Sequence, residues 1–135
     1  MKSLLVLDND IQQITQLEEF IEQFAEQAGL DMALTMSLNL ALEEAVSNVM
    51  MYAYPEGTKG QLEIEAGFEN GKCTFVISDS GVPFDPTTKQ DADISLSVEE
   101  RPIGGLGIFL VKNIMDSVSY ARKGEKNVLT LTKKV

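Results

Sequence analysis

Apolar residues recur at helical spacing in the first third of the chain. Between positions 11 and 28 they return every three or four residues, which places them on one stripe of a helix, and Gly29 follows as a stop signal. A second pattern of this kind runs from Asp31, which can cap a helix, to Tyr54, where Pro55 breaks helical structure. The sequence therefore predicts two consecutive helices that each bury one face.

Alternation of apolar and polar residues predicts strands on either side of these helices. The Asn70-Gly71 pair lies between two alternating segments and is typical of a two-residue hairpin turn, and Gly124 separates a later pair of segments. The first strand is expected at the edge of a sheet. The predicted strands occupy residues 2–7, 62–68, 73–77, 117–123 and 127–133.

Periodicity is lost between residues 80 and 104. This segment is rich in Ser, Asp, Pro, Thr and Gly, and a loop of such length inside a compact domain is uncommon and often functional. A run of glycines then opens a third helix, expected over residues 106–115. The order strand, helix, helix, strand, strand, loop, helix, strand, strand predicts an α+β fold, a two-layer sandwich with its helices on one face.

Length and composition fit one globular domain. The chain has 135 residues, 44% of them hydrophobic and 24% charged, which predicts a single domain over residues 1–135. It contains no long apolar run and no signal-peptide pattern, so no transmembrane helix and a cytoplasmic location are expected. Cys73 is the only cysteine of the chain, and a small buried side chain is expected there.

Charge narrows the range of partners. The net charge is −10, which argues against direct binding to nucleic acid or to an anionic membrane, because both depend on Lys and Arg. A protein partner with a basic face, or a small ligand, remains. The chain contains no histidine, which excludes a Ser-His-Asp hydrolase, a histidine metal site and a phosphorylated histidine on this chain.

Glu44 and Asn48 form the first polar pair with candidate chemistry. They are four residues apart in the second predicted helix and therefore lie on the same face, one turn apart. A carboxylate and a carboxamide in this arrangement can orient a nucleophile and bind a metal ion through oxygen. Taken alone, the pair also fits a solvated polar face of the helix.

A second candidate follows the strand predicted at residues 73–77. Asp79 ends a largely apolar segment, and Gly81 lies in the turn after it. A carboxylate at a strand end can accept a hydrogen bond from an exocyclic amine such as that of adenine, and a glycine lets the backbone approach a ring closely. An ordinary turn capped by Asp79 is the alternative.

The glycines at residues 104–107 precede a helix start. Free backbone N–H groups and the positive end of the helix dipole make such a start a site for an anion or a phosphate. The signal is weak by itself. The sequence lacks the GxxxxGK[ST] P-loop and the loop set of protein kinases, so neither of those nucleotide-binding folds is supported.

In order and spacing, the three segments together resemble the N, G1 and G2 boxes of the GHKL (Bergerat) ATPase superfamily over residues 31–133. They are most similar to one branch, the anti-sigma-factor serine/threonine kinases of the RsbW and SpoIIAB type. The matching segments are E-A-V-S-N at 44–48, D-S-G-V-P-F-D at 79–85, and G-G-L-G-I with L-V-K-N-I-M-D at 104–116. The resemblance implies the Bergerat fold, a two-layer α/β sandwich with a mixed sheet.

The resemblance also implies ATP and Mg²⁺ as ligands and assigns roles to matching residues. Asn48 would bind Mg²⁺ and, through it, the phosphates, and Glu44 would be the general base or orient a water. Asp79 would bind the adenine amine, and Gly81 would line the adenine pocket. Residues 86–104 would form a lid over ATP. The backbone at the start of the third helix would meet the phosphates at Gly105, Leu106 and Gly107.

The resemblance assigns no single role to the cations of the lid, and the sequence departs from relatives at three other positions. Lys89 and Arg101 are the cations of the expected lid, and each is either a phosphate contact or a solvated charge. Pro83 replaces a second glycine found in histidine-kinase and chaperone relatives, which favours the anti-sigma branch. Asn127 and Val128 stand where some anti-sigma kinases carry paired threonines, which leaves one hydrogen bond on the adenine side unassigned.

The activity implied by the resemblance is phosphorylation of a protein antagonist on serine or threonine, together with binding of a sigma factor, in partner-switching regulation. Two alternatives stay open. One is a nucleotide-dependent protein-binding module that transfers no phosphate, and the other is a detached catalytic domain of a two-component histidine kinase. Relatives often form homodimers, and the strand at residues 2–7 offers an edge for such pairing.

Overall fold

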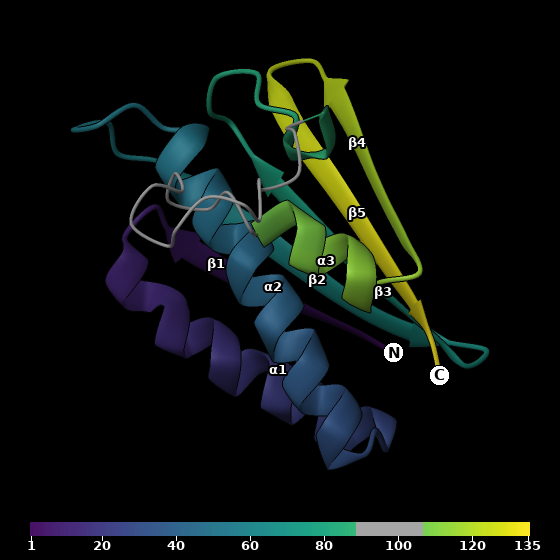
Figure 1. The fold of residues 1–135 in the computed structure, drawn as a ribbon. Helices are drawn as coiled ribbons and strands as arrows, with labels where there is room; N and C mark the ends of the chain where they lie inside the picture. Colours follow the sequence, from purple (N-terminus) through teal and green to yellow (C-terminus); the bar gives the residue numbers. More distant parts are fainter. Residues whose placement is uncertain (89–106) are drawn as a thin grey trace, which may run out of the picture.

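A sheet and a set of helices form two layers (Figure 1). The computed structural model describes residues 1–88 and 107–135. Within these two ranges, a five-stranded sheet forms one layer, and three α-helices cover one face of it (Figure 1). The predicted two-layer α+β sandwich with its helices on one face is confirmed. No helix in the described ranges combines the length and the apolar character needed to cross a bilayer.

The sheet has the strand order β1-β2-β3-β5-β4, so β1 and β4 form its edges. Each of the four neighbouring pairs is antiparallel. The sheet of the described residues is therefore antiparallel rather than mixed. The strands are β1 (Lys2–Asp8), β2 (Gln61–Glu69), β3 (Lys72–Asp79), β4 (Ser117–Lys123) and β5 (Lys126–Lys134).

The helical connections explain this antiparallel order. The α-helices α1 (Ile14–Ala28) and α2 (Met32–Tyr52) run in opposite directions, so the chain enters β2 at the end of the sheet where β1 leaves it. The third helix, α3 (Gly107–Ile114), precedes β4, which runs in the same direction as β3. Because β5 lies between β3 and β4, these two strands are not neighbours.

Two short 3₁₀ segments modify the predicted helix and loop. The first predicted helix begins as the 3₁₀ turn Ile11–Gln13, where the Asp10 carboxylate accepts a hydrogen bond from the Gln12 N–H at 3.0 Å. A second 3₁₀ turn, Pro86–Thr88, lies at the start of the segment expected to be a lid. Both turns begin close to Asp or Pro, which favour the start of helical structure.

The β2–β3 hairpin forms at the predicted Asn70-Gly71 turn. Both residues have positive φ, 53° for Asn70 and 72° for Gly71, as a type I′ turn requires. The turn sets the register in which Ile64 lies opposite Ile77. Both of these side chains are buried, so the register directs the apolar positions of β2 and β3 to the same inner face.

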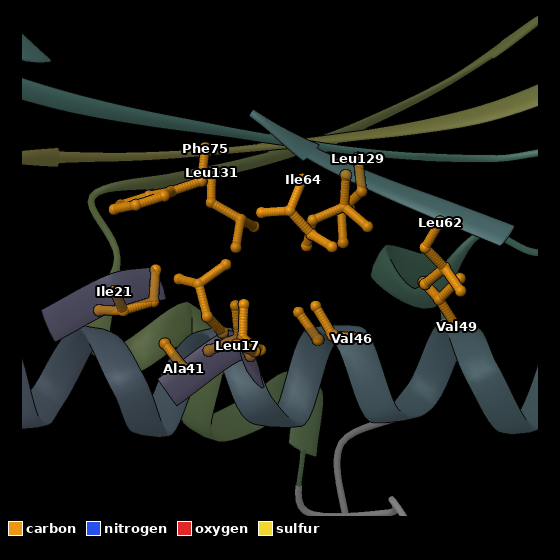
Figure 2. Close-up of a cluster of buried hydrophobic side chains, with 14 of the residues drawn as sticks. Leu17, Ile21, Ala41, Val46, Val49, Leu62, Ile64, Phe75, Leu129 and Leu131 are labelled. Atoms are coloured by element: carbon orange, nitrogen blue, oxygen red, sulfur yellow. The ribbon is translucent and has the colours of Figure 1, made fainter. Parts of the chain in front are cut away.

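The hydrophobic core lies between the sheet and the helices (Figure 2). Phe24 of α1 meets Phe75 of β3 edge to face, with ring centroids 5.5 Å apart. The buried residues of α2 run from Leu38 to Met50, and Asn48 is the polar residue among them. Other core side chains labelled in Figure 2 are Leu17, Ile21, Ala41, Val46, Val49, Leu62, Ile64, Leu129 and Leu131.

Replacing Asp31 with alanine is expected to lower the free energy of unfolding by about 1 kcal/mol. The Asp31 carboxylate accepts a hydrogen bond from the Leu34 N–H at 2.8 Å at the start of α2, and alanine removes this acceptor. Urea denaturation followed by circular dichroism measures the loss. Glu19→Ala, on the exposed face of α1, is the control. Unchanged stability of Asp31→Ala would contradict the capping role.

Candidate functional site

Three polar residues are buried in the described part of the chain. Asn48, Asp79 and Asn127 expose 2%, 3% and 3% of their surface. Asp79 and Asn127 lie opposite each other on β3 and β5. The end of α2 reaches the segment after β3, because the Ala53 C=O accepts a hydrogen bond from the Val82 N–H at 2.8 Å. The fold therefore brings the helix that carries Asn48 to the end of the strand that carries Asp79.

Asn48 has a buried side-chain oxygen, Oδ1, that has no hydrogen-bond partner among the described residues. A buried acceptor left in this state costs about 1–3 kcal/mol and needs an explanation. Asn39 Oδ1 shares the property, but the Asn39 side chain is only half-buried. A hard cation such as Mg²⁺ takes oxygen ligands of this kind, so the Asn48 amide fits the predicted metal site.

Glu44 lies one turn before Asn48 on α2, as predicted, and its side chain is half-buried. The neighbouring Glu43 has its pKa raised from 4.5 to about 7. The largest cause is a hydrogen bond with the Glu18 carboxyl, followed by burial and by the negative charges of Glu18 and Glu44. Glu43 therefore changes its charge near neutral pH, next to the predicted Glu44–Asn48 pair.

Stability is expected to fall as the pH rises from about 4.5 to about 7 because of Glu43. In this range the folded state keeps a proton on Glu43 that the unfolded state has lost. The stabilisation is fully present below the unfolded pKa and is lost above the folded pKa. Glu43→Gln carries no titrating proton, so its Tm should fall less than that of the wild type between about pH 5 and about pH 8. Equal falls in a thermal melt would contradict this.

Asp79 ends β3 and caps the turn that follows it. Its Oδ1 accepts hydrogen bonds from the Gly81 N–H at 2.8 Å and from Asn127 Nδ2 at 2.9 Å. The hydrogen bonds that the described residues donate to this carboxylate all go to Oδ1. Oδ2 is then the oxygen that can accept from a ligand. The capped turn and the predicted binding role are therefore compatible, because they use different oxygens.

Gly81 lies against the end of α2. Its carbonyl accepts a hydrogen bond from Arg122 Nη1 at 2.9 Å. A Cβ atom at position 81 would stand 2.2 Å from the carbonyl oxygen of Ala53, a distance that a packed interior does not allow. Backbone packing therefore requires glycine here, in addition to the predicted position beside a ligand.

Tyr54 is a residue of this region for which the sequence carries no signal. Its hydroxyl donates to the Gln61 C=O at 2.7 Å and accepts from the Ser80 N–H at 3.1 Å, and burial raises its pKa. Its partners are backbone groups that come close only in the folded chain. Tyr54 thereby joins the end of α2 to β2 and to the turn after β3. The rings of Tyr52 and Phe84 lie tilted against each other, with centroids 5.6 Å apart.

The predicted phosphate side of the site lies mostly outside the described residues. Gly105 and Leu106 fall there, as do Lys89 and Arg101 of the expected lid. Gly107 is the first residue of α3. The structure therefore positions the candidates for the metal and the adenine, whereas the contacts at the helix start stay a prediction.

Known sequences include relatives of this chain. The profile of the histidine kinase-like ATPase domain family matches residues 7–133. The serine/threonine-protein kinase BtrW from Bordetella bronchiseptica is 28% identical over 90 residues, which cover 67% of this chain and 63% of BtrW. The serine-protein kinase RsbW from Listeria monocytogenes is 34% identical over 92 residues, which cover 64% of this chain and 59% of that RsbW. The chain thus spans about three fifths of the length of these relatives.

Solved structures share the fold. The RsbU and RsbW domains of Rv1364c from Mycobacterium tuberculosis superpose with a TM-score of 0.71 and 14% identity, over 99% of this chain and 32% of that chain. The Acinetobacter baumannii histidine kinase AdeS gives a TM-score of 0.55 and 16% identity, over 98% of this chain and 68% of that chain. At these identities the likeness concerns the fold alone.

Proposed function

Because this chain belongs to the histidine kinase-like ATPase domain family, we propose that it is an ATP-dependent serine/threonine protein kinase of the anti-sigma-factor type. Its similarity to BtrW and RsbW, which are named as serine/threonine and serine kinases, supports this choice of reaction. The observation that carries the proposal is the buried Oδ1 of Asn48, which has no partner among the described residues and lies one helical turn from Glu44.

In this proposal Asn48 holds Mg²⁺. The ion prefers oxygen ligands and keeps several waters, so one amide oxygen suffices on the protein side when ATP oxygens complete the shell. When bound, Mg²⁺ neutralises negative charge on the phosphates. Burial of Asn48 within the packed part of α2 supports this role, because a rigid ligand needs no reordering when the ion binds.

Asp79 recognises the adenine in the same proposal. Oδ2 accepts a hydrogen bond from the exocyclic amine, while Oδ1 stays engaged with the protein. Gly81 keeps the backbone beside the ring free of a side chain. At the start of α3, backbone N–H groups donate to the phosphates, since a helix start favours negative charge. The residues assigned there are Gly105, Leu106 and Gly107.

Glu44 acts as the general base. The hydroxyl of a serine or threonine on the partner attacks the γ-phosphorus, and its proton passes to the Glu44 carboxylate. The bond between the γ-phosphorus and the bridging oxygen breaks, so that ADP leaves and a phosphoester remains. The location of Glu44, half-buried and one turn from Asn48, supports this role.

The partners are a sigma factor and an antagonist protein that receives the phosphate. The net charge of −10 favours partners with basic faces. A single domain over residues 1–135 and a cytoplasmic location belong to the same proposal. So does a homodimer through the edge strand β1, where Leu4 and Val6 expose 60% and 45% of their surface.

Transfer of a labelled γ-phosphate tests the proposal. The purified chain is incubated with Mg²⁺, γ-labelled ATP and a candidate antagonist protein encoded beside it. Acid-stable label on a serine or threonine of the antagonist is expected. Bound ATP without transfer would favour a nucleotide-dependent binding module instead. Acid-labile label on a histidine of another protein would favour a histidine-kinase catalytic domain.

A further inference from the structure

Asn127 is a buried amide whose hydrogen-bonding capacity is fully used. Its Nδ2 donates to Asp79 Oδ1 at 2.9 Å and to the Val82 C=O at 2.8 Å. Its Oδ1 accepts from the Phe84 N–H at 3.2 Å and from the Tyr120 hydroxyl at 2.5 Å. Four partners from two stretches of the chain, residues 79–84 and β4, therefore meet one side chain that exposes only 3% of its surface.

The four partners leave the amide one orientation. Two acceptors, Asp79 and Val82, face Nδ2, and two donors, Phe84 and Tyr120, face Oδ1. Turning the amide over would place its oxygen against a carboxylate and a carbonyl, and one of its N–H groups against the Phe84 N–H. In a buried site each mismatch leaves a polar group unsatisfied. The Asn127 donor is thus directed at Asp79 by the network itself.

We propose that Asn127 is a positioning residue that sets the nucleobase specificity of the site, an inference that rests on the proposed ATP-binding function. Together with the Gly81 N–H, Asn127 donates to Asp79 Oδ1, and these two bonds fix the rotation of the carboxylate and leave Oδ2 as the acceptor for a base. An acceptor at that point selects a base that presents an amine, as adenine does. It disfavours a base that presents a carbonyl oxygen, as guanine does, because two acceptors would face each other.

The same side chain also links base recognition to the shape of the following loop. Val82 and Phe84 flank Pro83 in the turn after β3, and Asn127 holds the backbone of both. Asn127 therefore couples the position of the Asp79 carboxylate to the position of the backbone at residues 82–84. A single hydroxyl, as in threonine, has one hydrogen to donate and cannot supply both Nδ2 bonds. The amide is what allows one residue to orient the carboxylate and anchor the loop.

The test measures how well the site distinguishes ATP from purine riboside triphosphate, which is ATP without the 6-amino group. Dissociation constants are measured by calorimetry in Mg²⁺ buffer. The wild type is expected to prefer ATP by about 10- to 100-fold, the range for a hydrogen bond to a charged group. Asn127→Ala is expected to bring the two constants within about threefold of each other, because the carboxylate then keeps only the Gly81 N–H as a donor and the turn that carries Gly81 loses its anchors at Val82 and Phe84.

Two further variants separate positioning from loop anchoring. Tyr120→Phe removes one of the four hydrogen bonds that hold the amide in place and leaves the ring, so an intermediate preference is expected. Arg122→Gln removes a different anchor of the same turn, the bond to the Gly81 carbonyl, without touching Asp79. It is expected to weaken both ligands by the same factor and to keep the wild-type preference. Tyr120→Phe decides the question if Asn127→Ala does not fold.

The positioning role of Asn127 and the proposed ATP site can fail separately in these measurements. If the wild type binds neither triphosphate, the proposed ATP site itself is wrong. If the wild type prefers ATP and the folded Asn127 and Tyr120 variants keep the full preference, the positioning role is overturned and ATP binding stands. If Arg122→Gln loses the preference as much as Asn127→Ala does, Asn127 only anchors the loop and the inference is again overturned.

Discussion

The Glu44→Gln variant is expected to transfer phosphate about 10²- to 10⁴-fold more slowly than the wild type, the range for loss of a general base. Glutamine has nearly the same shape but cannot accept the proton of the attacking hydroxyl. Glu44 lies one turn from Asn48 and does not replace it as the proposed metal ligand, so the affinity for Mg-ATP should change little. Single-turnover transfer and equilibrium binding, measured on the same preparation, separate the two effects.

Glu43 provides the matched control for this experiment. Glu43→Gln makes the same chemical change one position earlier, on a carboxyl that shares a hydrogen bond with Glu18. Its transfer rate should stay within about threefold of the wild type, because a residue outside the proposed machinery affects chemistry little. A Glu44→Gln protein that transfers phosphate as fast as the Glu43→Gln protein would remove Glu44 from the mechanism.

The Gly81→Val variant is expected to lose at least about 1–3 kcal/mol of stability, the usual cost of overpacking, and its binding of Mg-ATP as well. Its Cβ would stand 2.2 Å from the Ala53 carbonyl oxygen and 2.8 Å from the Ala53 carbonyl carbon. Neither is a flexible side-chain end, so the turn must move away from α2. The Val82–Ala53 backbone hydrogen bond would break, and the Asp79 cap on the Gly81 N–H would be displaced.

Urea denaturation and calorimetry on the folded fraction measure the two losses. Gly67→Ala is the control, because a Cβ at that position of β2 would find its nearest neighbour, the Met1 carbonyl oxygen, at an ordinary 3.7 Å. It should bind Mg-ATP like the wild type. A Gly81→Val protein with wild-type stability would show that the turn is not packed against α2 as described. Wild-type ATP affinity in a destabilised protein would exclude Gly81 from the site.

The helices and strands could be predicted because each depends on a pattern within one segment. Period-two alternation in β2 and β3 and the Asn70-Gly71 turn contain the information for that hairpin locally. The strand order and the antiparallel pairing of the whole sheet could not be predicted from patterns within single segments. Both depend on β5 lying between β3 and β4, which is decided by packing across the whole sheet.

The site could be predicted in part for the same reason. Asn48 and Asp79 belong to motifs with recognisable spacing, and the structure buries both. The orienting network around Asn127 joins residues more than 40 positions apart, so spacing alone cannot reveal it. One signal was present in the sequence. Asn127 continues the inward-facing series that includes Leu129 and Leu131, and a polar residue in such a series marks a buried contact that needs partners.

Calorimetric titration with ATP, in Mg²⁺ and then in EDTA, tests the central claim most directly when the wild type is compared with Asn48→Ala. The variant removes a buried acceptor that has no partner among the described residues, so it should fold without a large loss of stability. The wild type should bind one ATP per chain in Mg²⁺ and much more weakly in EDTA, and the folded variant should lose the Mg²⁺-dependent affinity. No ATP binding by the wild type, or Mg²⁺-dependent binding that Asn48→Ala leaves intact, would contradict the account.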